Sequence, residues 1–475
     1  MQNALFRLLI VAIIIGLTGI IISAQIPDTA WTKTYGGFEN DYGYDIEQTS
    51  DGGFIIAGST ASFGPGWWNI YLIKADAFGD TVWTTTCEVD EADAALSVEQ
   101  CRDGGYIAAC DGFTDLIRLD GNGDSLWTSN LGIDAKVVRQ TDDGGFIVGG
   151  IISVEGYGQA CLVKTDSLGG SVWYRTYQTG VVSEINSLEQ TDDSGFIAAG
   201  LVYTSESWWD YLLIKTDESG DTIWTKTYGT IAYPEESYAI LQTNDGGFII
   251  TGLWFWTIKT DALGDSVWSN YYGYGEIGCA NSICQTGDGG YMLFGYIDPS
   301  GPDDAQAYIV KIDSLGNNVG DTEYGTPGGW DYGNSISPAG DGGFIMTGWT
   351  DSYGEGLKDI WVIKTIGEQA GIEYVPGDAN MYNGDWPPAI IGSDVTYLVN
   401  YFRGLTTNPA CLLDGFYVAA DVNGSCAVIG SDVTRMVNFF RGQGAIEPCP
   451  DYPPLWPTPA DCPEIAPPGW PNCEQ

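Results

Sequence analysis

The chain has 475 residues, a formal net charge of −45 and no histidine. Its length allows two or three domains. Its negative charge argues against binding to a nucleic-acid backbone, which requires clustered Lys and Arg. The same charge favours a soluble surface with an affinity for cations. The lack of histidine excludes a Ser-His-Asp triad and removes the most common general base and zinc ligand.

The N-terminus has the pattern of a secretory signal peptide. Arg7 supplies a positive charge, the apolar run "LLIVAIIIGLTGIII" follows it, and Ser23-Ala24 offers small residues for cleavage near Gln25. The alternative is an uncleaved membrane anchor, although the run is short for a spanning helix. We therefore expect residues 1–24 to be removed, and the protein to be secreted or held at the cell surface without a membrane span, where disulfides can form.

A hairpin motif, "DGG[FY]" or "DSGF", occurs seven times between residues 31 and 366. Asp-Gly and Gly-Gly accept positive φ, so this motif between two β-prone runs predicts a hairpin. A second hairpin follows, with a strand such as "YLIK" (71–74), a turn "D-x-x-G-[DGN]" and a last strand that opens with Trp in most copies; in the sixth copy Gly320 replaces the Trp. The motif opens at Asp51, Asp103, Asp143, Asp193, Asp245, Asp288 and Asp341.

Each copy therefore offers four short strands, with a repeat of about 44 to 52 residues, which is typical of a propeller blade. The predicted fold class is all-β, with a seven-bladed β-propeller of four-stranded blades over residues 31–366. The strand at 31–37 has no blade before it, and the seventh copy lacks its last strand. We expect residues 31–37 to complete the seventh blade and close the ring, which removes exposed sheet edges.

The turn of the second hairpin resembles a known repeat. "TDALGDSVW" (260–268) is similar to the tryptophan-docking repeat of quinoprotein propellers, with one residue fewer between Asp and Trp. The blades as a whole resemble secreted bacterial β-propeller repeats of the "DGGFIIAG" type. The resemblance implies a β-propeller fold. Because the vicinal Cys pair expected of a quinone enzyme is absent, we infer no quinone cofactor.

A Lys or Arg occupies one position of the third strand in every copy. It is either a repeated structural ion pair with its stem packed along the sheet, or one member of a cation ring that faces an anionic ligand. The overall acidity favours the structural interpretation. These residues are Lys74, Arg118, Lys164, Lys215, Lys259, Lys311 and Lys364.

The loops between the two hairpins of a copy are rich in tryptophan. Aromatic faces with flanking carboxylates suit sugar rings, and flat aromatics also anchor protein partners. The alternative is packing at the blade edge, since one of two adjacent residues in a strand must point inward. The candidate ligand-binding residues are Trp67, Trp68, Trp208, Trp209, Trp254, Trp256 and Trp349.

After residue 366 the repeat stops, and two copies of "IGSDVT-x-x-VN-[YF]-F-RG" follow within residues 378–442. In the second copy the spacing is that of a calcium loop, in which oxygens at alternate positions converge on a hard cation. Each loop precedes a segment with helical periodicity, such as "VTRMVNFF", which Gly442 ends. The expected ligands are Asp421, Asn423, Ser425, the Ala427 carbonyl and Asp432 in the second loop, and Asp378, Asn380 and Asp394 in the longer first loop.

This duplicated loop and helix resembles the type I dockerin repeat. The resemblance implies a small α-helical domain organised by Ca²⁺, which presents Gly392-Ser393 and Gly430-Ser431 to a cohesin-like partner or a cell-surface scaffold. The alternative is a pair of helices with acidic caps. Residues 367–377 are interpreted as a linker and residues 443–475 as a Pro/Cys-rich tail, whose cysteines suggest disulfide stapling of the C-terminal region.

Two functions are compatible with these patterns. The first is a secreted, non-catalytic binding or scaffold protein, whose propeller binds a polysaccharide or a protein and whose C-terminal module docks in a calcium-dependent way. The alternative is an extracellular polysaccharide-degrading hydrolase. A glycosidase needs two carboxylates at a defined separation, but among 63 acidic residues the sequence identifies no such pair. We expect no catalytic residues.

Overall fold

The computed structural model describes residues 26–366, with gaps at 66, 88–93, 113, 205–207, 231–233, 274–276 and 300–303. The chain divides into two units, Met1–Gly367 and Glu368–Gln475, and all described residues belong to the first. The predicted signal peptide, linker, dockerin-like domain and tail therefore lie outside the described residues. The same is true of the expected calcium ligands and of the Gly-Ser pairs expected to bind a partner.

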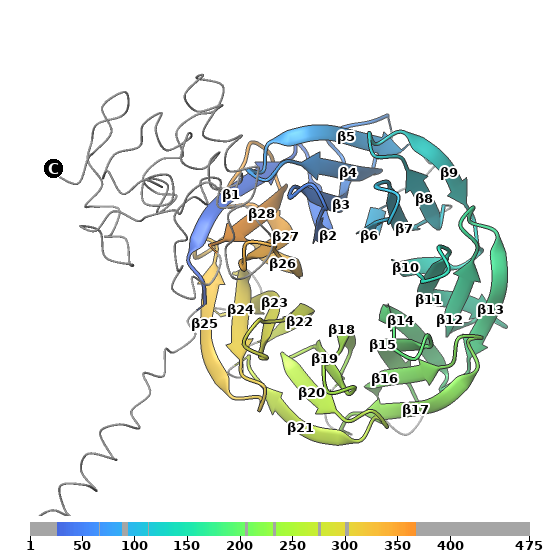
Figure 1. Ribbon diagram of the computed structural model, residues 1–475. Helices are drawn as coiled ribbons and strands as arrows, with labels where there is room; N and C mark the ends of the chain where they lie inside the picture. The colour runs from blue at the N-terminus through green and yellow to red at the C-terminus, as the bar shows by residue number, and fades with distance from the viewer. Residues whose placement is uncertain are drawn as a thin grey trace, which may run out of the picture. The chain divides into compact units, whose positions relative to one another are not determined.

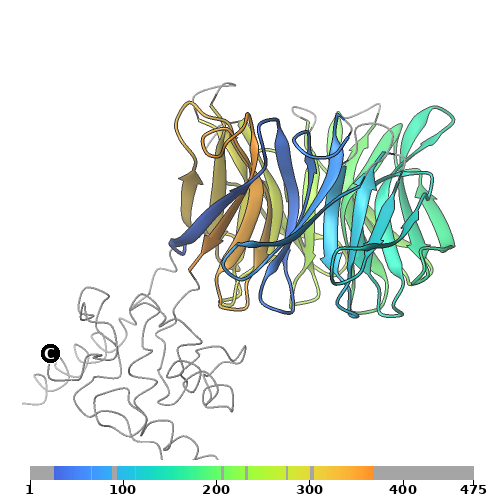
Figure 2. The same ribbon diagram turned by 90° about the horizontal axis from the view of Figure 1, so that it is seen from above.

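The described residues form seven four-stranded antiparallel sheets arranged around a ring, as Figure 1 shows. This confirms the predicted all-β, seven-bladed propeller. Figure 2 shows the ring from the side, with strands running between its two faces. In the first six blades the strands follow chain order from the centre outwards, so the first strand of each blade lines the central channel.

The strand bounds repeat from blade to blade. Blade 1 contains β2 (Asp41–Gln48), β3 (Phe54–Thr60), β4 (Asn69–Ala75) and β5 (Thr81–Cys87). Blade 2 contains β6 (Ala94–Gln100), β7 (Tyr106–Asp111), β8 (Leu116–Leu119) and β9 (Ser125–Ser129). Blade 3 contains β10 (Asp134–Gln140), β11 (Phe146–Val154), β12 (Tyr157–Thr165) and β13 (Ser171–Tyr177). Blade 4 contains β14 (Val182–Gln190), β15 (Phe196–Tyr203), β16 (Trp209–Thr216) and β17 (Thr222–Tyr228).

The remaining blades complete the ring. Blade 5 contains β18 (Ser237–Gln242), β19 (Phe248–Gly252), β20 (Trp256–Thr260) and β21 (Ser266–Tyr271). Blade 6 contains β22 (Ile277–Gln285), β23 (Tyr291–Asp298), β24 (Gln306–Ile312) and β25 (Asn318–Tyr324). Blade 7 contains β26 (Asp331–Pro338), β27 (Phe344–Thr350), β28 (Asp359–Thr365) and, from the start of the chain, β1 (Thr29–Tyr35).

The ring is closed by β1, as expected from the sequence. This strand pairs with β28 in antiparallel register, with Trp31 opposite Lys364 and Tyr35 opposite Ile360. The closing strand spans Thr29–Tyr35, two residues earlier than predicted at each end. In Figure 1 it lies beside β28 although the two strands come from opposite ends of the described chain.

The two faces of the ring carry different connections. Because neighbouring strands are antiparallel, the β2–β3 and β4–β5 turns share one face, which we call the hairpin face. The β3–β4 loop and the connection from one blade to the next lie on the other, which we call the loop face. Gly52, in the first turn, has a φ of 82°, a conformation that glycine adopts without steric cost. The same turns recur around the ring, so variation in loop length is concentrated on the loop face.

Neighbouring blades interlock through tryptophan and glycine. The ring of Trp224 in blade 4 packs on the turn glycine Gly264 of blade 5, where a Cβ would lie 3.0 Å from the indole. Blade 6 would place its tryptophan on a turn of blade 7, but β28 and β1 are not joined by a turn. This explains the Gly320 substitution. Ile26 packs there instead, beside a cavity of about 400 Å³.

The hydrophobic core lies between adjacent blades. At the closure, Tyr35 and Ile360 of blade 7 pack with Phe54 and Ile73 of blade 1 in one buried cluster. The middle strands β3 and β4 are buried along their whole length. The six cysteines of the described residues are free thiols, so no disulfide staples this part of the chain. The described part also contains no helix that is long and apolar enough to cross a membrane.

Candidate functional site

The repeated basic residue is structural. Lys259 is only 4% exposed, and its Nζ lies 2.9 Å from Asp245 Oδ2 and 2.9 Å from the carbonyl oxygen of Thr260. Burial alone would raise the pKa of Asp245, but hydrogen bonds from Thr243, Lys259 and the Gly247 N–H outweigh it and lower the pKa to about 2. The same pairing between the "DGG" aspartate and the Lys or Arg recurs in every copy, so the cation-ring interpretation is wrong.

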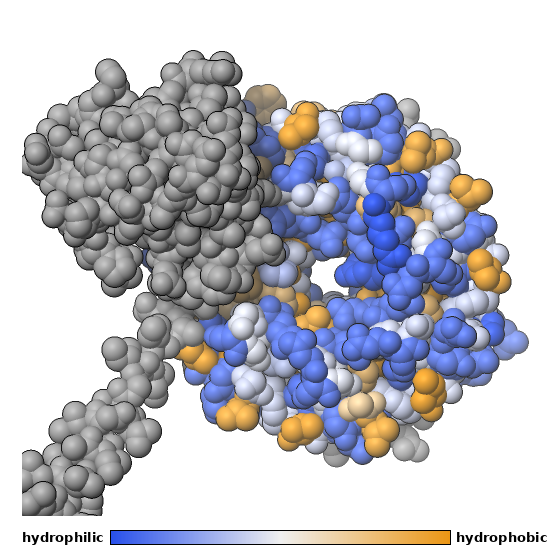
Figure 3. Space-filling view, viewed as in Figure 1, coloured by the Kyte–Doolittle hydropathy of each residue, from blue (hydrophilic) through white to orange (hydrophobic). Residues whose placement is uncertain are grey.

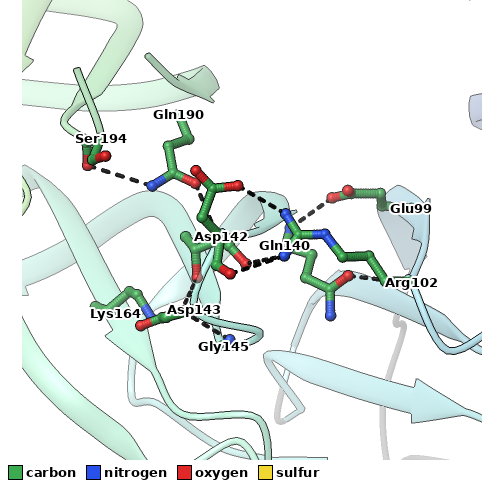
Figure 4. A network of polar contacts seen from close by, with 10 residues as sticks. Glu99, Arg102, Gln140, Asp142, Asp143, Gly145, Lys164, Gln190 and Ser194 are labelled. Carbon is green, nitrogen blue, oxygen red and sulfur yellow. Dashed lines mark hydrogen bonds and ion pairs between the residues drawn. The ribbon is translucent and has the colours of Figure 1, made fainter. Parts of the chain in front are cut away.

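A belt of glutamines joins the blades near the hairpin face. The Arg102 N–H donates to Gln140 Oε1 at 2.9 Å, and the Asp142 N–H donates to Gln190 Oε1 at 3.0 Å. The guanidinium of Arg102 also pairs with Asp142 at 3.0 Å, as Figure 4 shows. These contacts join residues of consecutive blades, which indicates that the hairpin face serves assembly of the ring.

The central channel is polar and mainly acidic. Figure 3 shows an opening at the centre of the ring, surrounded largely by hydrophilic residues. Glu47 accepts a hydrogen bond from the Gln100 N–H at 2.9 Å, and Glu99 accepts one from the Gln140 N–H at 2.7 Å. Burial raises the pKa of Glu47 to about 7, against the effect of the Gln100 bond. The Arg139 guanidinium faces these carboxylates. Burial alone would lower its pKa, but the negative charges of Asp45, Glu99 and Glu47 outweigh burial and raise it.

The loop face carries a cluster of stacked aromatic rings where blades 1 and 7 meet. Tyr42, at the start of β2, stacks on Trp68 of the β3–β4 loop with centroids 5.3 Å apart and an interplanar angle of 20°. Tyr332, at the start of β26, stacks on Trp349 of β27 at 4.3 Å and 13°. The two pairs meet edge to face, because the ring centroids of Tyr42 and Trp349 are 5.4 Å apart and their planes are inclined by 79°. We call these four residues the aromatic platform.

Further aromatic rings extend the platform over blades 6 and 7. Tyr296, from β23, lies 4.2 Å from Tyr332, and Trp330 lies 6.4 Å from the same ring. All of these side chains are partly exposed. Beside the platform, Trp67 projects from the β3–β4 loop with 91% of its surface exposed. A large apolar side chain held in water in this way is a typical anchor for a ligand.

One lysine lies over the platform. Lys358, just before β28, places its Nζ 4.0 Å from the ring centroid of Trp349, 5.0 Å from that of Trp330 and 5.6 Å from that of Tyr42. Burial lowers the pKa of Lys358, while the charge of Asp351 opposes the shift. Contacts of this kind contribute about 0.5–2 kcal/mol. Lys358 therefore contacts three aromatic rings, of which Tyr42 lies near the start of the described chain and Trp330 and Trp349 lie near its end.

The structure separates the seven candidate tryptophans. Trp68 and Trp349 belong to the platform, with Trp67 beside them. Trp208, 65% exposed, and Trp209, which packs on Tyr203 at 5.3 Å, lie in blade 4. The candidates therefore do not form a single site, and only the three tryptophans of blades 1 and 7 lie together.

The two tryptophans of blade 5 have packing roles. Trp254 is in the turn between β19 and β20 with a φ of 65°, and its Nε1 is buried without a hydrogen-bond partner in the described part of the chain. Trp256 is 8% exposed and lies between Tyr211, at 4.9 Å, and Tyr271, at 5.6 Å. Neighbouring rings therefore pack against Trp256, and its role as a ligand-binding residue stays a prediction.

Sequence reasoning missed five residues of the site, namely Tyr42, Tyr332, Lys358, Tyr296 and Trp330. The first two share the tripeptide "DYG", at 41–43 and 331–333, which precedes the hairpin motif in these two copies alone. That unshared feature was a usable signal. Lys358 had no signal, because it follows a variable loop. The fold brings it over Trp330 and Trp349 of its own copy and over Tyr42 of blade 1.

Comparisons with known proteins find only distant structural similarity. No family model matches the chain, and no curated protein matches it. A protein of unknown function from Bacteroides caccae is 11% identical, with a TM-score of 0.41, over 62% of this chain and 98% of its own. BamB from Moraxella catarrhalis is 14% identical, with a TM-score of 0.41, over 72% of this chain and 94% of its own. The class of the described chain is defined by its own seven four-stranded sheets, which form a seven-bladed β-propeller.

Proposed function

We propose that this protein is a secreted, non-catalytic binding protein whose propeller takes a carbohydrate on the aromatic platform. The observation that carries the proposal is the pair of stacked rings at the junction of blades 1 and 7, with the exposed Trp67 beside them. The C–H faces of sugar rings stack on aromatic faces. Asp351 and Glu355 of the neighbouring loop are exposed and can accept hydrogen bonds from hydroxyl groups.

The charge of the protein favours an uncharged ligand. A net charge of −45 repels nucleic acids and strongly anionic polysaccharides. Neutral sugars lose little by approaching such a surface, because their hydroxyl groups donate to carboxylates. We therefore take neutral polysaccharide as the ligand class and a protein ligand as the competing outcome.

The C-terminal region supplies attachment in this proposal. Its dockerin-like loops bind Ca²⁺ and its helices dock onto a cohesin-like protein or a cell-surface scaffold. The support for this part is the duplicated calcium-loop spacing in the sequence, with Asp421, Asn423, Ser425 and Asp432 as the best-matched ligands. The two regions together describe a protein that holds a polysaccharide close to a surface.

The test is a glycan array followed by calorimetric titration of neutral cello-, xylo- and manno-oligosaccharides. We expect at least one of these to bind, and Trp349→Ala to weaken binding by about tenfold or more, as for a central anchor. Trp208→Ala removes an exposed tryptophan of blade 4 and should leave the affinity unchanged. Lack of binding to every glycan, or equal losses in both variants, would contradict the proposal.

The same titration separates binding from hydrolysis. A binding protein returns the oligosaccharide intact, whereas the hydrolase alternative releases reducing sugars from it. Release that increases with time and protein concentration would establish the hydrolase alternative.

A further inference from the structure

Two buried carboxylates lie directly beside the platform, one on each side of the ring closure. Asp41 is 0% exposed and precedes Tyr42, and Asp359 is 2% exposed and follows Lys358. The Asp41 N–H donates to the Lys358 carbonyl at 2.7 Å. Both carboxylates converge on Gly36, where a Cβ would lie 2.0 Å from Asp359 Oδ1 and 2.6 Å from Asp41 Oδ2. The two carboxylates are therefore neighbours, packed against a glycine that a larger residue could not replace without displacing them.

The charge of this pair has no basic partner. No Lys or Arg within the described residues forms an ion pair with Asp41 or Asp359. Asp41 Oδ2 accepts hydrogen bonds from the Gly37 N–H at 2.8 Å and from Ser62 Oγ at 2.7 Å. Oδ1 of the same side chain is buried and has no hydrogen-bond partner among the residues that the structure describes. A buried charge is costly unless it is paired or coordinates a metal.

The environment of Asp359 reflects this cost. Its Oδ2 accepts hydrogen bonds from the N–H groups of Glu355, at 2.9 Å, and Gly356, at 3.2 Å. Burial is the largest influence on Asp359 and raises its pKa, and the charge of Asp41 raises it further, against those two hydrogen bonds. The pair therefore favours a positive charge between its members.

The junction of blades 6 and 7 provides an internal comparison. There Asp331, also 0% exposed, occupies the place of Asp41, and a Cβ on Gly325 would lie 2.3 Å from Asp331 Oδ2. The second neighbour of that glycine is the neutral Gln306, with Oε1 at 2.6 Å. Asp331 Oδ1 accepts a hydrogen bond from Thr350, and Oδ2 accepts from Ser352 Oγ at 2.7 Å. With one carboxylate, both oxygens are satisfied by the protein.

We propose that a calcium ion binds between Asp41 and Asp359 and ties blade 1 to blade 7 beneath the aromatic platform. Calcium takes carboxylate and main-chain carbonyl oxygens together. The carbonyl oxygens of Gly37 and Glu39 face Gly356, where a Cβ would lie 2.1 and 2.9 Å from them. The ion neutralises both carboxylates and takes the unpartnered Oδ1 of Asp41. This site is separate from the calcium loops expected in the C-terminal region, and it does not depend on the carbohydrate.

The test compares the full-length wild type with Asp359→Gln, which installs the residue found at the junction of blades 6 and 7. Calcium is titrated at pH 7.5, and the protein is melted in calcium and in EDTA. We expect the variant to bind one calcium ion fewer per chain and to lose a calcium-dependent rise of about 5 °C in Tm. Glu218→Gln, which removes an exposed carboxylate in the β16–β17 turn of blade 4, should bind the wild-type number.

Asp41→Asn makes the test independent of any loss of folding. Because it removes the repulsion within the pair, this variant should melt above the wild type in EDTA and below it in calcium. The proposal fails if Asp359→Gln binds as many calcium ions as the wild type. It also fails if the Tm of the wild type does not change with calcium but rises on mild acidification. A proton shared between the two carboxylates would then neutralise the pair in place of the ion.

Discussion

At the scale of single residues, the repeated Asp–Lys pair shows how an acidic chain uses its few cations. Each ammonium or guanidinium group is buried, while the carboxylate partner stays largely exposed; for Lys259 and Asp245 the side-chain exposures are 5% and 66%. Removing one partner of such a pair leaves a buried charge uncompensated. Seven of the 18 basic residues are committed in this way, so they are unavailable to an anionic ligand.

This pairing predicts a specific acid sensitivity. The pKa of Asp245 is lowered from 3.8 to about 2, so its ionised form stabilises the fold fully above about pH 4 and the contribution is lost as the pH falls towards 2. Asp245→Asn should therefore reduce the decline in unfolding free energy over that range. The difference stays below about 1 kcal/mol, because solvent screens the exposed carboxylate. Chemical denaturation between pH 2 and 5 measures it, and an unchanged slope would contradict the assignment.

At the scale of the strand and turn, six of the seven blade junctions are locked by a tryptophan that packs on a turn glycine, the exception being the junction of blades 6 and 7. Gly264, with a φ of 78°, has a Cβ position 3.0 Å from Trp224, whereas Gly246, with a φ of 79°, has nothing within 4 Å of its Cβ position. The backbone conformation of the two glycines is therefore matched. Only the contact with the neighbouring blade differs.

These two glycines separate backbone strain from packing between blades. Gly246→Ala should cost about 1 kcal/mol, the penalty of a positive φ for alanine. Gly264→Ala should cost about 1–3 kcal/mol more, because its methyl group displaces the indole of Trp224. Urea unfolding of both variants measures the difference. Equal costs would show that the tryptophan does not hold the blades together.

At the scale of the whole molecule, the closing strand is bonded to blade 1 in the same way as the last strand of blade 3 is bonded to blade 4. The Tyr35 hydroxyl, from the closing strand β1, donates to the Gly79 carbonyl at 2.6 Å. The Tyr177 hydroxyl makes the same bond to Gly220 at 2.8 Å, between blades 3 and 4. Both hydroxyls are buried, so β1 contacts blade 1 as β13 contacts blade 4.

Tyr35→Phe and Tyr177→Phe should therefore destabilise the protein equally, each by about 1 kcal/mol, the net value of a buried hydrogen bond. Thermal unfolding followed by calorimetry gives both values in the same buffer. A negligible effect at Tyr35 beside a normal effect at Tyr177 would indicate that β1 is only loosely attached to blade 1.

The ring was predictable from the sequence because its information is local and repeated. Hairpin glycines, apolar runs and the unpaired strand near residue 31 each state their role within a few residues, and seven copies reinforce one another. The platform was not predictable, because its two stacked pairs come from the first and the last copy of the repeat. These copies are far apart in the sequence and become neighbours only in the closed ring. Adjacent tryptophans such as Trp67 and Trp68 were identified, but their periodicity could not show which neighbour would stack on Tyr42.

The central claim is that the loop face at the junction of blades 1 and 7 holds the ligand. Hydrogen–deuterium exchange, with and without the neutral oligosaccharide that binds most tightly, tests it most directly. The account predicts protection at the start of β2, in the β3–β4 loop around Trp67 and Trp68, and at Trp349 and Lys358. Protection confined to the hairpin face, or to the loops of blade 4 around Trp208, would contradict it.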